Sequence, residues 1–161
     1  MPTDTRLVLR PATAKDGETV IALINALAEY DKMPSLDSDA KKRLLRDAFE
    51  KKRFEMIIAE WEGKPAGYAV FAETYSTFEA RPTLYMDDLF VYDQYRGRHI
   101  GYELFRYGLR EAKRRDCGRM EWLVLDWNRP ALGFYDHFGA QKLQKWVPFR
   151  LNREDIDKMT R

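Results

Sequence analysis

The chain has 161 residues, a length typical of one domain, and 45% of them are apolar, which excludes a globally disordered protein. Its 28 basic and 26 acidic residues leave a net charge of only +2, so the composition gives no support for nucleic-acid binding. Cys117 is the only cysteine, which excludes an intrachain disulfide, and no apolar stretch is long enough to cross a membrane. We therefore expect a cytoplasmic protein without membrane association.

The first part of the chain predicts one strand and two helices. Residues 7–10 form the short strand, which ends at a proline. Apolar residues then recur at helical spacing over 20–27, with Thr13 or Asp16 as the helix cap. The second helix is expected to begin at Ser38, whose hydroxyl suits a cap.

Three strands are predicted next, over residues 54–61, 67–75 and 85–91, because aromatic and branched side chains are frequent there. The residues Glu-Gly-Lys at 62–64 are typical of a tight hairpin turn between the first two strands. These strands should form an antiparallel meander.

The residues from Arg96 to Gly101 predict a loop that opens a helix and is suited to an anion. Gly97 and Gly101 let the backbone approach a ligand closely, and the free N–H groups of the helix start point into the loop. Arg96 and Arg98 add positive charge, and this combination favours a phosphate. From the residues alone, an ordinary strand-to-helix turn with solvated arginines is equally compatible.

The last part of the chain predicts further alternation of helices and strands. A helix follows the loop, and a strand is predicted over 120–127. Asn128 caps a short helix, and a last strand over 142–151 precedes a terminal helix. Together the elements predict an α/β (α+β) fold in a single domain, residues 1–161. Its central sheet should be mixed, mostly antiparallel, and flanked by helices on both faces.

Two motifs in the second half resemble the GNAT acyltransferase superfamily. The segment Arg96–Gly101 resembles its acetyl-CoA signature, which reads Arg or Gln, two residues, Gly, one residue, then Gly or Ala. His99 stands where the middle Gly is usual, and histidine tolerates a positive φ better than most residues. Residues 123–140 resemble the family segment with Asn, Phe-Tyr and Gly-Ala. The motif Trp-Asn-x-Pro-x-x-x-Phe-Tyr and the sequence of the 85–91 strand are similar to those of the spermidine/spermine and thialysine N-acetyltransferase branch.

The resemblance implies the GNAT fold and acetyl-CoA as the acetyl donor. The pantetheine arm would pair with the backbone of the 85–91 strand near its end, and the pyrophosphate would lie on the glycine-bearing loop. The implied cofactor residues are Leu89, Phe90, Val91, Arg96, Gly97, Arg98, His99, Ile100, Gly101, Tyr102, Asn128, Arg129, Pro130 and Ala131. The Val91 N–H would polarise the thioester carbonyl. No residue spacing indicates a metal site, so we expect no metal.

An amine must lose a proton before it attacks, and a carboxylate can take that proton. Asp87 and Asp88 are the candidates, although Asp87 stands where similar proteins carry the longer Glu. Adjacent strand residues point to opposite faces, so only one can line a given side unless a bulge re-aims the other. Each could instead cap a turn or pair with an arginine. The resemblance implies that Tyr135 protonates the leaving thiolate; from spacing alone Tyr135 would be a core aromatic.

A cationic substrate also requires acidic and aromatic walls. The resemblance places Tyr30, Asp31, Phe78 and Trp122 on the substrate side, together with the two carboxylates. A purely structural role, as ordinary core or rim residues, would explain these four residues nearly as well.

The resulting hypothesis is an N-acetyltransferase that acts on a primary amine of a small cation, either a di- or polyamine or a lysine-like amino acid. Transfer would be direct, in a ternary complex. The alternatives are a GNAT enzyme acting on protein amines and a non-catalytic acyl-CoA sensor. Similar enzymes are homodimers, and the predicted final strand offers an aromatic edge, Trp146–Leu151, for pairing.

Overall fold

The computed structural model describes residues 4–161, which divide into two compact units. The first unit ends at Leu123 and contains the whole sheet; the second runs from Val124 to Arg161. Each unit is described by itself. Within the described part of the chain, no helix is long and apolar enough to span a membrane.

The first unit is built on a five-stranded sheet in the order β1-β2-β3-β4-β5. The strands are β1 (Leu7–Pro11), β2 (Glu55–Trp61), β3 (Lys64–Ser76), β4 (Arg81–Val91) and β5 (Arg119–Trp122). The first four strands pair antiparallel, and β5 joins β4 in parallel. The predicted mixed, mostly antiparallel sheet and its meander are therefore confirmed. The hairpin turn between β2 and β3 uses positive φ angles of 50° at Glu62 and 77° at Gly63, which suit a tight two-residue turn.

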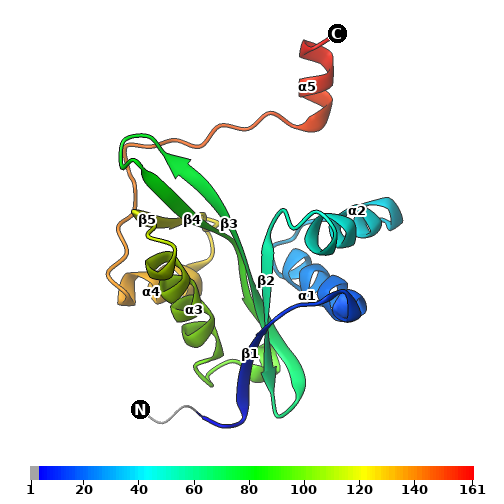
Figure 1. The fold of residues 1–161 in the computed structure, drawn as a ribbon, viewed down its shortest axis with the longest axis vertical. Helices are drawn as coiled ribbons and strands as arrows, with labels where there is room; N and C mark the ends of the chain where they lie inside the picture. Colours follow the sequence, from blue (N-terminus) through cyan, green and yellow to red (C-terminus); the bar gives the residue numbers. More distant parts are fainter. Residues whose placement is uncertain (1–3) are drawn as a thin grey trace. The chain divides into compact units, whose positions relative to one another are not determined.

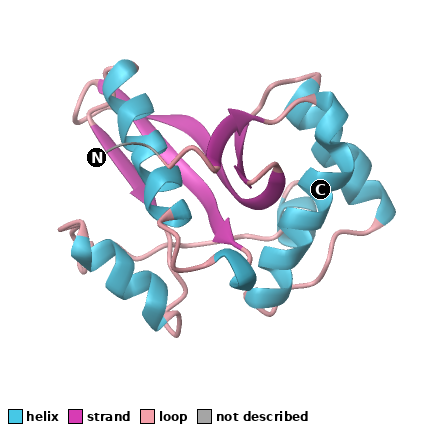
Figure 2. Cartoon of the chain, turned by 90° about the horizontal axis from the view of Figure 1, so that it is seen from below, coloured by secondary structure: helices cyan, strands magenta, loops and turns pink. Residues whose placement is uncertain are grey.

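Helices lie on both sides of the strands (Figures 1 and 2). In the first unit α1 (Gly17–Tyr30) and α2 (Ser38–Phe49) cover one face, and α3 (Ile100–Arg114) covers the other (Figure 1). The second unit contains α4 (Arg129–His137) and α5 (Arg153–Met159). Asp16, one of the two predicted caps, occupies the N-cap position of α1, and its carboxylate accepts the Thr13 N–H at 2.7 Å. Asp37 rather than Ser38 caps α2, because its carboxylate accepts the Ala40 N–H at 2.8 Å and its charge favours the helix start.

The two faces of the sheet bury separate sets of side chains. Val20 and Leu23 of α1 pack with Tyr68 and its neighbours on one face, and all three are fully buried. Burial of such an aliphatic side chain stabilises the fold by about 1.5–3 kcal/mol. On the other face Phe71 stacks on Tyr107 of α3, with ring centroids 6.2 Å apart.

Strand β4 departs from regular pairing in its middle. Val70 of β3 lies opposite Asp88, but the next residue, Phe71, lies opposite Met86, so Asp87 is an extra residue on a β-bulge. Pairing with β5 ends at Met86, opposite Trp122. Within residues 4–161, the rest of β4 therefore has no strand partner on the β5 side.

Of two strand predictions near the C-terminus, one is confirmed in part, as β5, and the other is wrong. The strand expected over 120–127 ends at Trp122, because the chain turns there and the Asn128 N–H donates to the Leu125 carbonyl. The strand expected over 142–151 is absent, and its large side chains are exposed, for example Trp146 at 72%. Strand propensity depends mainly on how well side chains pack against neighbouring strands, and the side chains of this segment have no such packing partners in the single chain. The predicted terminal helix is confirmed as α5.

Candidate active site

The bulge of β4 brings two acidic side chains to one place. Asp88 lies opposite Val70, on the face covered by α1, and its Oδ2 accepts a hydrogen bond of 3.0 Å from the Tyr68 hydroxyl. The pKa of Asp88 is raised to about 6: burial is the main cause, the nearby charges of Asp87 and Asp31 contribute in the same direction, and the Tyr68 hydrogen bond opposes them. Asp88 is therefore ionised at neutral pH but more basic than an ordinary aspartate.

Asp31 and Asp87 complete a group that we call the carboxylate cluster (Asp31, Asp87 and Asp88). Asp31 caps the C-terminus of α1, and Asp87 is the exposed extra residue of the bulge. Desolvation by the surrounding protein raises the pKa of both carboxyls. Asp31 and Asp87 act electrostatically on Asp88, so the three carboxylates make a site that attracts a cation and holds a proton acceptor.

Aromatic rings surround the carboxylate cluster. Phe90 packs against Tyr30, Tyr68 and Tyr92, with centroids 6.5, 6.3 and 5.6 Å apart. The Arg96 guanidinium lies 4.9 Å from the centre of the Tyr30 ring, so it already covers one face of the ring that was expected to meet the substrate.

Arg96 connects the predicted cofactor loop to the end of β4. Its Nε donates to the Val91 carbonyl at 3.1 Å, and it pairs with Asp93 at 2.7 Å. The Tyr92 N–H donates to the Ala66 carbonyl at 2.9 Å. Because backbone groups alternate in direction along an antiparallel strand, the N–H and C=O of Val91 point away from β3. They therefore face the side that β5 leaves open.

The loop has the backbone that the sequence predicted. Gly97 has φ 76° and His99 has φ 59° and ψ 15°, a left-handed conformation, immediately before α3 begins at Ile100. Gly101 differs, because a side-chain carbon added there would meet only Val91, at 3.7 Å. The fold does not require glycine at position 101, so the close approach of an external group is the remaining physical reason for it. Arg98 stacks on Trp61, 5.1 Å from the ring centre.

Two other residues predicted for the substrate side are not shown to contact the carboxylate cluster. Trp122 ends β5 opposite Met86, and its ring packs edge-on against Phe105 of α3 at 5.2 Å. Phe78 lies in the turn between β3 and β4 and is 93% exposed. Six strand residues separate that turn from the bulge, a distance of about 20 Å. The structure therefore does not bring Phe78 to the carboxylate cluster of its own chain.

The second unit carries the remaining predicted residues. Asn128 caps α4, as predicted, and its side chain accepts the Ala131 N–H at 3.3 Å, with a proline in the first turn. Tyr135 lies on the same helix, and burial raises the pKa of its hydroxyl. The roles of Tyr135, Asn128, Arg129, Pro130 and Ala131 stay predictions.

Tyr68 was missed by the sequence reasoning. The available signal was a tyrosine inside a buried strand, since a buried hydroxyl requires a hydrogen-bond partner. Its partner, however, depends on the bulged register of β4, which residue spacing does not reveal.

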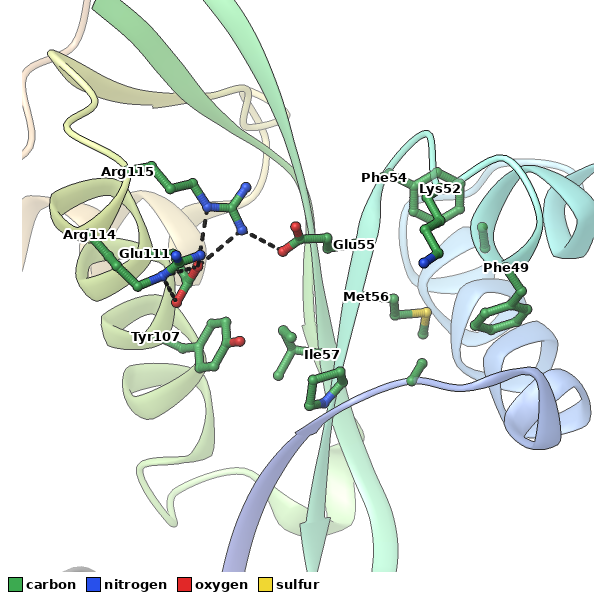
Figure 3. A pocket seen from close by; sticks show the side chains of 13 residues that line it. Phe49, Lys52, Phe54, Glu55, Met56, Ile57, Tyr107, Glu111, Arg114 and Arg115 are labelled. Atoms are coloured by element: carbon green, nitrogen blue, oxygen red, sulfur yellow. Dashed lines mark hydrogen bonds and ion pairs between the residues drawn. The ribbon is translucent and has the colours of Figure 1, made fainter.

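A cavity of about 620 Å³ lies elsewhere, between the end of α2, the start of β2 and α3 (Figure 3). Its arginines pair with acidic residues: Arg115 contacts Glu55 at 2.5 Å, and Arg114 contacts Glu111 at 2.7 Å. It includes no residue of the carboxylate cluster. Within residues 4–161, no three His, Cys, Asp or Glu side chains are grouped as metal ligands.

Comparison with known proteins identifies the family of the chain. Residues 20–140 match the acetyltransferase (GNAT) family. The thialysine N-ε-acetyltransferase of Mus musculus is 30% identical over 163 residues, covering 94% of this chain and 95% of its own length. The Caenorhabditis elegans enzyme of the same name is 32% identical over 149 residues, covering 91% and 92%. The spermidine/spermine N(1)-acetyltransferase-like protein 1 of Homo sapiens is 31% identical over 159 residues, covering 92% of this chain and 23% of that protein.

Solved structures share the fold. An integron cassette protein from the mobile metagenome of V. cholerae has a TM-score of 0.81 at 21% identity, covering 98% of this chain and 99% of that one. AAC(6')-Iy, solved in complex with the bisubstrate analogue CoA-S-monomethyl-acetylneamine, has a TM-score of 0.77 at 16% identity, covering 92% of this chain and 99% of that one. The match over residues 20–140 and the full-length relatives lead to one conclusion: the chain belongs to the GNAT acetyltransferase family and is an acetyl-CoA-dependent N-acetyltransferase.

Proposed function

We propose that the protein transfers the acetyl group of acetyl-CoA to a primary amine of a small cation, either a di- or polyamine or a lysine-like amino acid. The observation that carries this proposal is the carboxylate cluster beside the open end of β4. Relatives of about 30% identity are named for thialysine and for spermidine/spermine, both of which are small amines. Transfer is direct, in a ternary complex of enzyme, donor and amine.

The donor would bind along the open side of β4. Leu89 and Val91 offer outward backbone groups to the pantetheine arm, with Phe90 between them, and the loop 96–102 offers N–H groups and the positive end of α3 to the pyrophosphate. Asn128, Arg129, Pro130 and Ala131 are the further cofactor residues that the family resemblance implies. The outward N–H of Val91 polarises the thioester carbonyl, a contribution of a few kcal/mol.

The acceptor amine would bind at the carboxylate cluster. Its ammonium group is attracted by the negative charge, and Asp87 or Asp88 takes the proton that must leave before attack. Tyr135 protonates the departing thiolate. Apart from burial, the groups that raise the pKa of Asp88 are the acidic side chains Asp87 and Asp31. A second cationic group on the substrate is therefore favoured over a carboxylate, so diamines should be better acceptors than amino acids.

We also propose that the chain is a single domain that acts in the cytoplasm as a homodimer. Residues 141–152 are all exposed in the single chain, and they include Trp146, Val147 and Phe149. A second copy would remove these apolar side chains from water. Light scattering at micromolar concentration should give twice the chain mass, and a monomeric mass would contradict the dimer.

A panel of amines tests the function. The assay follows the release of free thiol from acetyl-CoA with diamines, polyamines, lysine-like amino acids and lysine-containing peptides side by side. We expect turnover with small diamines and little with peptides. Turnover with peptides alone would favour an enzyme for protein amines, and acetyl-CoA binding without turnover on any amine would favour the non-catalytic sensor.

A further inference from the structure

Tyr68 directs a fully buried hydroxyl at the candidate active site. The residue lies on β3 with 0% of its surface exposed, and its ring packs against Phe90 within the core cluster that α1 covers. Its hydroxyl donates to Asp88 Oδ2 at 3.0 Å. Because the packed ring cannot move aside, the phenol holds one oxygen of Asp88 in a defined position.

The neighbouring carboxylate is held differently. Asp87 is the extra residue of the bulge and is exposed, and within residues 4–161 no hydrogen bond or ion pair engages its carboxylate. Two adjacent aspartates therefore differ in kind. Asp88 is half-buried and held by the Tyr68 hydroxyl, whereas Asp87 is exposed and free to follow a ligand.

We propose that Tyr68 is a positioning residue that fixes Asp88 as the acceptor of the amine proton, while Asp87 attracts the cation. This assignment rests on the proposed acetyl transfer. In the step, one proton passes from the substrate ammonium to a carboxylate oxygen of Asp88. The freed nitrogen lone pair forms the C–N bond to the acetyl carbon, and the C–S bond breaks. The nitrogen then loses a second proton to become the amide, and the departing CoA thiolate takes up one proton to leave as the thiol.

The groups around Asp88 explain why the phenol is needed. Asp31 faces it from α1 and Asp87 from β4, and both charges favour its protonated form, as does burial. Arg96 stacks on Tyr30 nearby, but its charge is engaged by Asp93. The Tyr68 hydrogen bond is the interaction that lowers the pKa of Asp88 and so keeps the carboxylate ionised near neutral pH.

The substitution Tyr68→Phe isolates the hydroxyl while keeping the ring. Loss of a hydrogen bond to a charged group should raise the pKa of Asp88 by about one unit. The acid limb of the pH profile of kcat/KM should move up by the same amount. Activity should then fall by about fivefold at pH 6 from protonation alone, and this component should vanish by pH 9. Tyr92→Phe removes a hydroxyl from the same aromatic group and should leave the limb in place, as a matched control.

Removing Asp88 provides the second test. Asp88→Asn should abolish the acid limb, and adding Tyr68→Phe to it should cost no further activity, because Tyr68 acts through Asp88. If circular dichroism shows that Tyr68→Phe does not fold, the test rests on Asp88→Asn alone. An unchanged acid limb in Asp88→Asn then overturns the proposal.

A merely structural role of Tyr68 would lower activity equally at every pH, and that result also overturns the proposal. Failure of the proposed function has a different signature, since wild-type protein would then turn over no amine. In that case titration of the Asp88 carboxyl by NMR, in wild type and Tyr68→Phe, still tests the coupling of the two residues. An unmoved titration refutes the positioning role independently of turnover.

Discussion

Replacing Asp88 by Asn should make the protein more stable at neutral pH. The pKa of Asp88 is raised from its ordinary value of 3.8 to about 6, chiefly by burial. The folded state therefore holds the proton more tightly than the unfolded state, and stability falls as pH rises from about 4 to 6 and then levels off. The full difference corresponds to about 3 kcal/mol above pH 7. Asn lacks the charge and keeps an acceptor for Tyr68, but its amide needs a partner, so we expect a gain of about 1–3 kcal/mol.

The measurement is the free energy of unfolding in urea for wild type and Asp88→Asn at several pH values. The gain should be largest at pH 8 and should shrink below about 1 kcal/mol at pH 4, where Asp88 is protonated in the folded state. Asp126→Asn, at an exposed position, is the control and should change stability by less than about 0.5 kcal/mol throughout. A variant that is less stable than wild type at pH 8, or whose gain does not depend on pH, would refute the burial of a destabilising charge at this site.

Three further substitutions test other parts of the structure. Gly67→Ala places a methyl group 2.4 Å from the Phe90 carbonyl oxygen, so it should cost about 1–3 kcal/mol in urea unfolding; wild-type stability would contradict the close approach of β3 and β4. Gly101→Glu should abolish acetyl-CoA binding in calorimetry through bulk and repulsion, while Gly101→Ala keeps the fold; unchanged affinity in folded Gly101→Glu would remove the loop from the cofactor site. Tyr135→Phe should lower kcat by about 10²–10⁴-fold with acetyl-CoA affinity unchanged, and higher pH should not restore kcat. A variant that keeps most of its kcat would show that Tyr135 has only a packing role.

Local signals predicted much of the fold. The turn at 62–64 and the strands beside it are specified by neighbouring residues, and the positive φ at His99 follows from the resemblance of the loop. The strand over 142–151 failed for the opposite reason. Its side-chain pattern fits a buried strand, but burial depends on a neighbour that the single chain does not supply.

The candidate site was predicted as a set of residues and not as an arrangement. Asp87 and Asp88 were identified together, and the possibility of a bulge was recognised, but the sequence does not contain the register that creates it. Tyr68 lies 20 positions away from Asp88 in the chain, and only the pairing of β3 with β4 brings the hydroxyl within 3.0 Å of its partner. Contacts between distant residues require the assembled sheet, so spacing alone cannot provide them.

The extra residue in β4 has an evolutionary consequence. Met86 and Asp88 keep the pairings with Phe71 and Val70 that an uninterrupted strand would give them, as though Asp87 were not there. Deletion of this one residue would therefore leave the alternation of core side chains intact on both sides. Reactive chemistry at the bulge can be gained, lost or altered in descendants of this chain while selection on the hydrophobic interior continues unchanged.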